Sequence, residues 1–158
     1  MNIFISHKLE DSDTAKAIAA VLRRIEVDYY LDVLDDFTIK DGESLTNHIR
    51  NELNECTDLI VVMSSITKFS QWVPFEIGMA AQAYMPTASY LSENIALPEF
   101  LEFWPRLKTP SDILHYVNVK RMTFRKSIDE RGPILESQKI FNRKNDLNRF
   151  YSELKRTL

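Results

Sequence analysis

The stretch SSITKFSQWVPFEIGMAA, residues 64–81, places one acidic side chain, Glu76, among aromatic and apolar neighbours near the predicted start of a helix. Trp72 precedes it by four residues, so in a continuous helix the indole and the carboxylate share one face. Two interpretations are open. A glutamate in the first turn of a helix offsets the positive end of the helix dipole, and a tryptophan is commonly a packing anchor. The alternative is a ligand site in which the indole stands beside a functional carboxylate.

The elements that would position this pair alternate between strand and helix. Residues 58–65, DLIVVMSS, are apolar on consecutive positions, the pattern of a central strand of a parallel sheet covered on both faces. Apolar residues at helical spacing follow each of the first three strands, and three such units in a row indicate an open α/β sheet. The expected strands are 2–6, 27–32, 58–65 and 87–92, and a helix from about Pro74 to Met85 carries Glu76.

The rest of the chain is expected to be helical apart from a proline-punctuated stretch with at most a short fifth strand. Asp11 or Ser12 is expected to cap the first helix, and Ser111 the helix that starts near it. The tail repeats apolar residues at helical spacing, at Leu147, Phe150, Tyr151 and Leu154. We predict a flavodoxin-like parallel sheet of four to five strands with helices on both faces. It spans residues 1–126, and a helical extension, 127–158, either packs on it or serves as an interface.

Ligands of open α/β sheets bind outside the carboxyl ends of the strands. Those ends supply a rim of polar residues, and Glu76 enters it because its helix begins about ten residues after the third strand. The predicted rim consists of Ser6, His7, Lys8, Asp32, Ser64 and Ser65.

Composition excludes several classes of function. A net charge of -3 implies no broad basic surface for nucleic acid. Three glycines cannot supply a Gly-rich phosphate or dinucleotide loop, and three scattered histidines with one cysteine have no metal-site spacing. Cys56 is expected to be a core thiol. The single cysteine, together with the lack of a signal-peptide pattern or a membrane-spanning apolar run, predicts a cytoplasmic protein with no membrane partner.

Three stretches together resemble a known family. NIFISHKLED follows the first-strand motif of the TIR (Toll/interleukin-1 receptor) domain, and YYLDVLDDFTIKDGESL follows its second strand and the loop after it. CTDLIVVMSSITKFSQWVPFEIGMA is similar to its third strand and Trp-x-x-x-Glu pair. The resemblance covers residues 1–85 strongly, and it is greatest to bacterial TIR proteins that consume NAD in antiviral defence (Thoeris-like).

The resemblance implies cleavage of the bond between nicotinamide and ribose in NAD, with NAD as the substrate and no cofactor. Nicotinamide leaves a cationic pyridinium as a neutral molecule, so no acid is required, and one ionised carboxylate can stabilise the oxocarbenium-like ribose. The helix dipole would keep that carboxylate ionised. The family's site maps here onto Glu76 as the catalytic residue, Trp72 as a wall of the nicotinamide pocket, and Ser6, His7, Lys8, Asp32, Lys40 and Asp41 as substrate-binding residues, the last two in a loop that closes over the site.

The same resemblance leaves three functions open. The first is an NAD-cleaving enzyme that releases ADP-ribose, a cyclic isomer or a conjugate, self-associates through TIR surfaces and supplies a signal read by a separate effector. The second is a non-catalytic TIR adaptor. The third is a nucleoside deoxyribosyltransferase-like enzyme, which also sets a glutamate at the rim of an α/β sheet.

Overall fold

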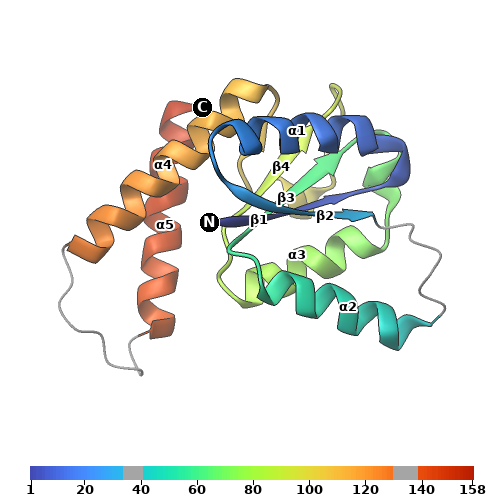
Figure 1. Cartoon of the computed structure of the whole chain (residues 1–158), viewed down its shortest axis with the longest axis horizontal. Coiled ribbons are helices and arrows are strands. Elements are labelled where there is room, and N and C mark those ends of the chain that lie inside the picture. Colours follow the sequence, from blue (N-terminus) through green and yellow to red (C-terminus); the bar gives the residue numbers. More distant parts are fainter. Residues whose placement is uncertain (34–40, 130–138) are drawn as a thin grey trace.

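Five parallel strands form one sheet in the computed structural model, which describes residues 1–33, 41–129 and 139–158. The spatial order is β2-β1-β3-β4-β5, so the chain reverses direction across the sheet after β2. The strands are β1 (Asn2–His7), β2 (Asp28–Val33), β3 (Asp58–Met63), β4 (Thr87–Leu91) and β5 (Arg106–Leu107). The predicted open α/β sheet is therefore confirmed, including its short fifth strand (Figure 1).

Helices cover both faces of this sheet. One face carries α1 (Ser12–Arg24), α4 (Pro110–Asp129) and α5 (Lys139–Thr157), and the other carries α2 (Gly42–Asn54) and α3 (Trp72–Gln82) (Figure 1). Alternate strand residues serve the two cores because successive side chains point to opposite faces. Ile60 and Val62 of β3 face the α1 side, and Leu59 and Val61 the α2 side. No helix within the described residues combines the length and hydropathy needed to cross a bilayer.

Cys56 lies just before β3 in the core beneath α2 and α3. Its side chain is buried, and burial raises the pKa of the thiol to about 11. A thiol with so high a pKa is almost fully protonated at neutral pH and is a poor nucleophile. The prediction of a core thiol is confirmed.

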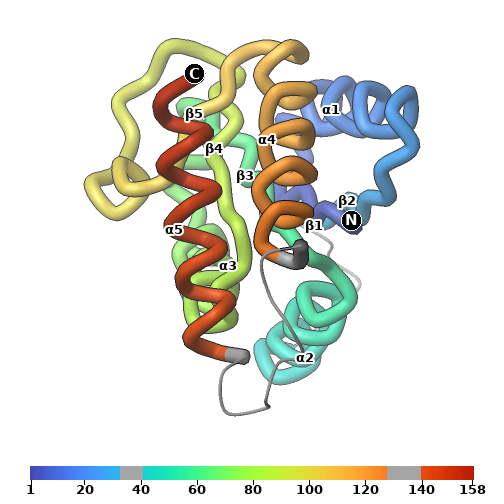
Figure 2. The backbone as a smooth tube through the Cα atoms, turned by 90° about the vertical axis from the view of Figure 1, so that its left-hand side faces the viewer, coloured from blue at the N-terminus to red at the C-terminus, as the bar shows by residue number. Residues whose placement is uncertain are grey.

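The tail helix α5 packs lengthwise beside α4 and against the sheet (Figure 2). Its apolar stripe enters the core of the α1 face, where Phe150 and Leu154 have no exposed surface. The Tyr151 hydroxyl accepts from the Thr87 backbone N–H at 2.8 Å and donates to the Thr87 carbonyl at 3.2 Å. The stripe is therefore used for packing inside the molecule. The predicted boundary after residue 126 falls inside α4, three residues before that helix ends.

The helix starts differ from the predictions in three places. Helix α3 begins at Trp72 rather than Pro74, since a proline in a first turn gives up no hydrogen bond. Asp11 precedes α1 but makes no side-chain cap, because its carboxylate is used elsewhere. Ser111 is not the cap of α4, which starts one residue earlier. Thr109 Oγ1 accepts from the Asp112 N–H at 3.2 Å, while the Asp112 carboxylate accepts from the Thr109 N–H at 2.9 Å.

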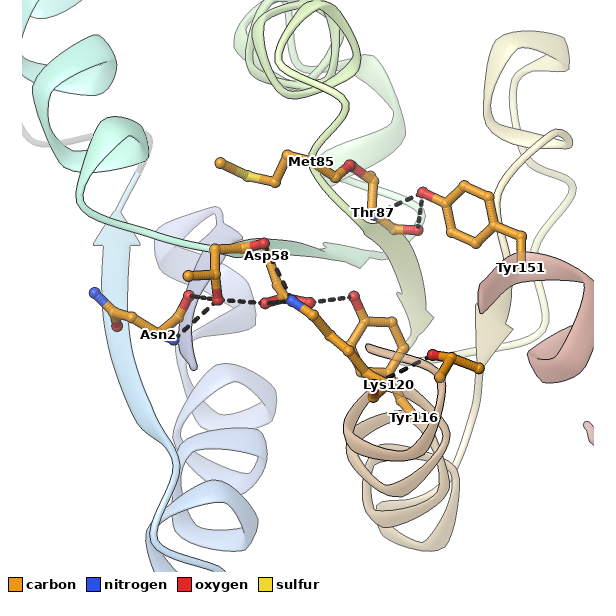
Figure 3. A network of polar contacts seen from close by, with 9 residues as sticks. Asn2, Asp58, Met85, Thr87, Tyr116, Lys120 and Tyr151 are labelled. Atoms are coloured by element: carbon orange, nitrogen blue, oxygen red, sulfur yellow. Dashed lines mark hydrogen bonds and ion pairs between the residues drawn. The ribbon is translucent and has the colours of Figure 1, made fainter. Parts of the chain in front are cut away.

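A charged cluster anchors α4 to the amino end of β3 (Figure 3). Asp58 has no exposed surface and forms an ion pair with Lys120, whose side chain is also buried. Tyr116 donates to Asp58 Oδ1 at 2.9 Å, and Thr57 Oγ1 donates to Asp58 Oδ2 at 2.5 Å. Such a pair is tolerated in an apolar core because both carboxylate oxygens are satisfied. It lies at the opposite edge of the sheet from the predicted rim.

We expect Lys120→Ala to lower the free energy of unfolding by about 3–5 kcal/mol, since it leaves the buried Asp58 carboxylate without its counter-charge. Urea unfolding followed by circular dichroism would measure the loss. Lys126→Ala, at an exposed position six residues further along α4, is the control and should change stability by no more than about 0.5 kcal/mol. Equal effects of the two substitutions would show that the ion pair does not anchor the helix.

Candidate functional site

Glu76 lies in the second turn of α3, at the carboxyl edge of the sheet. Its side chain has no exposed surface. Ser6, near the end of the neighbouring strand β1, donates its hydroxyl hydrogen to Glu76 Oε2 at 2.5 Å. The two residues are 70 positions apart in the chain, so this contact exists only because β1 and β3 are adjacent in the sheet.

A second carboxyl group lies beside Glu76. Asp32 is the register partner of Ser6 across the β1–β2 pair, and its side chain is buried, so it lies on the same face of the sheet as the serine that donates to Glu76. Glu76 Oε1 is also the one buried side-chain oxygen or nitrogen, among the described residues, that lacks a conventional partner. An ionised carboxylate with such an oxygen is costly to bury.

Burial is the main cause of the ionisation behaviour of this pair. It raises the pKa of Glu76 well above the ordinary range, and the nearby negative charge of Asp32 raises it further, against the opposing effect of the Ser6 hydrogen bond. Burial also raises the pKa of Asp32, while the hydrogen bond with Glu76 lowers it. The sequence predicted that the helix dipole keeps Glu76 ionised. The structure differs, because Glu76 lies beyond the first turn, where the dipole acts, and has no access to water.

Two histidines act on Asp32, and a tyrosine contacts one of them. His48 of α2 places Nε2 3.8 Å from Asp32 Oδ1 and 3.2 Å from the Tyr30 hydroxyl oxygen. His7, at the end of β1, is buried, and burial lowers its pKa despite the neighbouring Asp32 charge. His7 was among the predicted site residues, whereas His48 and Tyr30 were not. A signal for them existed, since Tyr30 and Asp32 are two residues apart on β2 and share the face that the following helix covers.

The other predicted site residues lie in different surroundings. Lys8 is half-buried directly after β1. Asp41 is exposed and caps α2, where it accepts from the Ser44 N–H and hydroxyl, each at 2.8 Å. Lys40 lies outside the described residues. Trp72 is the half-buried first residue of α3, and its ring meets that of Phe75 edge-on at 5.8 Å. Helical geometry thus extends from Trp72 to Glu76, so the two residues are one turn apart on the same helix.

The loop that carries the chain from β3 to α3 is held by a polar cluster that sequence reasoning missed. Asp11 Oδ2 accepts from Ser64 at 2.7 Å and also from Thr67. All three side chains are buried. This cluster joins the end of β3 to the start of α1 and so fixes where α3 begins. Ser65 belongs to the same loop, and its N–H donates to Glu93 at 2.5 Å.

The raised pKa of Glu76 predicts how stability depends on pH. A group whose pKa is higher in the folded state stabilises fully below its unfolded value, and this contribution is lost as the pH rises toward the folded value. Glutamine cannot ionise. Glu76→Gln should therefore become more stable relative to the wild type as the pH rises from 4 to 8. The difference in the free energy of unfolding should grow by up to about 1.4 kcal/mol for each pH unit.

Urea unfolding of both proteins at pH 4, 6 and 8 would measure this difference. Glu55→Gln, at an exposed position, controls for the loss of one negative charge. A difference between Glu76→Gln and the wild type that stays constant over this range would mean that Glu76 ionises freely in the folded protein.

The comparisons with known proteins agree with this architecture. The family model for the TIR domain matches residues 3–130. A search of the curated proteins returns no match to the chain.

Proposed function

Because the chain belongs to the TIR domain family, we propose that it is an enzyme that cleaves the bond between nicotinamide and ribose in NAD. TIR domains include NAD-cleaving enzymes and adaptors. The observation that favours the enzyme is the placement of Glu76. It lies at the carboxyl edge of the sheet, bonded to Ser6, beside Asp32, and one turn from Trp72. A domain that only assembles has no need for two buried carboxyl groups at the edge where α/β folds bind ligands.

The proposed chemistry needs one charged group at the reacting centre. Nicotinamide departs with the electron pair of the glycosidic bond and becomes neutral, so its departure requires no acid. The positive charge that develops on the ribose is what the protein must stabilise, and an ionised Glu76 would do so across a short distance in a site that excludes water. Ser6 would hold the carboxylate in place through its hydrogen bond, and Trp72 would wall the nicotinamide.

Access is the main constraint on this proposal. Since Glu76 has no exposed surface, NAD can meet it only after a rearrangement at the carboxyl edge of the sheet. TIR domains self-associate, and we propose that association between copies produces the open form. A dilute monomer is then expected to be nearly inactive.

The biological role that we propose rests on the resemblance to bacterial TIR proteins of antiviral defence. In that role the ADP-ribosyl product, linear, cyclic or conjugated, is a signal that a separate effector reads. The mass of the product distinguishes a hydrolase from a cyclase or a transferase.

One observation favours the adaptor as the second candidate. Several apolar side chains near the start of α3 face solvent, with Phe69 78% exposed and Ile66 45% exposed. Exposed aromatic and aliphatic side chains beside one another are typical of association surfaces. An adaptor would use them to bind another TIR domain without any chemistry at Glu76.

We predict that Glu76→Gln lowers the turnover of NAD by about a hundredfold or more, the usual scale for removing one group that stabilises transition-state charge. Nicotinamide and all ADP-ribosyl products would be resolved by chromatography and mass at high protein concentration and in crowded solution. Glu55→Gln should retain full activity. If the wild-type protein cleaves no NAD even when it is assembled, the proposal of an enzyme is wrong and the adaptor is favoured.

A further inference from the structure

The resting structure poses a problem for the function proposed above, on which this inference rests. The chemistry needs an ionised Glu76, yet in the structure its carboxyl group is sealed from water and lies against a second carboxyl group. Removing its proton directly to solvent would leave a buried charge without a partner, which is costly. An acceptor inside the protein would let the proton leave Glu76 while the site still excludes water.

We propose that Asp32 is this acceptor: it shares one proton with Glu76 at rest, takes that proton when the cationic pyridinium ring of NAD binds, and releases it to solvent on the side of His48. Asp32 acts through Glu76 and does not itself attack the substrate. The geometry that carries the proposal is the Ser6–Glu76 contact at 2.5 Å, the unpartnered Glu76 Oε1, and the buried Asp32 side chain at the β2 position paired with Ser6.

The proton balance closes over one cycle. At rest Glu76 holds the proton and Asp32 is ionised. Binding places the pyridinium charge near Glu76, and the proton moves to Asp32. The bond between ribose and nicotinamide then breaks, water adds to the ribose carbon, and Glu76 takes the proton that this water loses. The proton on Asp32 leaves, so one proton is released for each NAD hydrolysed and the resting state returns.

The path from Asp32 to solvent that the proton would take is short. Asp32 Oδ1 lies 3.8 Å from His48 Nε2, and the His48 side chain is 36% exposed, while Asp32 itself is buried. Tyr30 contacts the same imidazole nitrogen at 3.2 Å and fixes its position. Glu52 of α2 and His7 of β1 also act on Asp32, and Asp11 acts on His7. Of these groups, His48 combines a contact with the Asp32 carboxylate and a partly exposed side chain.

The test is the pH dependence of NAD cleavage in Asp32→Asn. Asparagine keeps the shape of aspartate but cannot accept the proton, so the buried Glu76 must ionise directly. We expect kcat to fall roughly a hundredfold at neutral pH, with a smaller change in KM, and the acid limb of the kcat profile to move to higher pH. If Asp32 only repelled charge, its loss would ease the ionisation of Glu76 and move the limb to lower pH. An unchanged limb or a downward shift overturns the proposal.

Asp28→Asn, at the exposed amino end of the same strand, is the matched control and should leave the profile unchanged. A second measurement needs neither a variant nor catalysis. The side-chain carboxyl carbons of Asp32 and Glu76 in the wild type, followed by 13C NMR against pH, should both show the same two-step titration of a coupled pair. Independent single steps overturn the proposal. Wild-type protein that cleaves no NAD but titrates as a pair would instead refute the function and retain the shared proton.

Discussion

The complete burial of strand β3 is the constraint on which the rest of the structure depends. All six of its residues are buried, because helices cover both faces and β1 and β4 pair with both edges. A strand in that position cannot leave polar groups unsatisfied at its ends. Its amino end is satisfied by the ion pair of Asp58 with Lys120, and its carboxyl end by the contacts of Ser64 with Asp11. These two sets of contacts fix α4 on one side and the start of α3 on the other.

The two ends treat a buried carboxyl group differently. Asp58 receives a counter-charge and two hydroxyl donors, so its charge is compensated and its role is structural. Glu76 receives one hydroxyl from Ser6 and a neighbouring acid, so its charge is not compensated. The fold compensates the charge of Asp58 but supplies no counter-charge for Glu76, so it gives up stability at Glu76. Carboxyl groups that lack such compensation are commonly found where a group must change its charge during function.

Glu76 has no exposed surface, so the proposed function requires a motion that opens the site. The hydrogen bond that orients Glu76 also belongs to the packing that seals it, so a rearrangement that admits NAD also changes the surroundings of the carboxylate. Apolar side chains that face solvent near the start of α3, above all Phe69, lie on the same segment of chain. Association at this surface and access to Glu76 are therefore able to influence each other through the position of α3.

The sequence by itself determined the order of strands and helices, the buried central strand, the core position of Cys56 and the placement of Glu76 near the start of a helix. These follow from periodicity and local spacing, which act over a few residues. It missed the Asp58 cluster, the contacts of His48 and Tyr30, the true cap of α4 and the raised pKa of Glu76. Each of these depends on groups brought together from distant positions, such as Ser6 and Glu76, 70 residues apart. Only the tertiary structure decides those distances and the exclusion of water, and these two quantities set the charge of a buried acid.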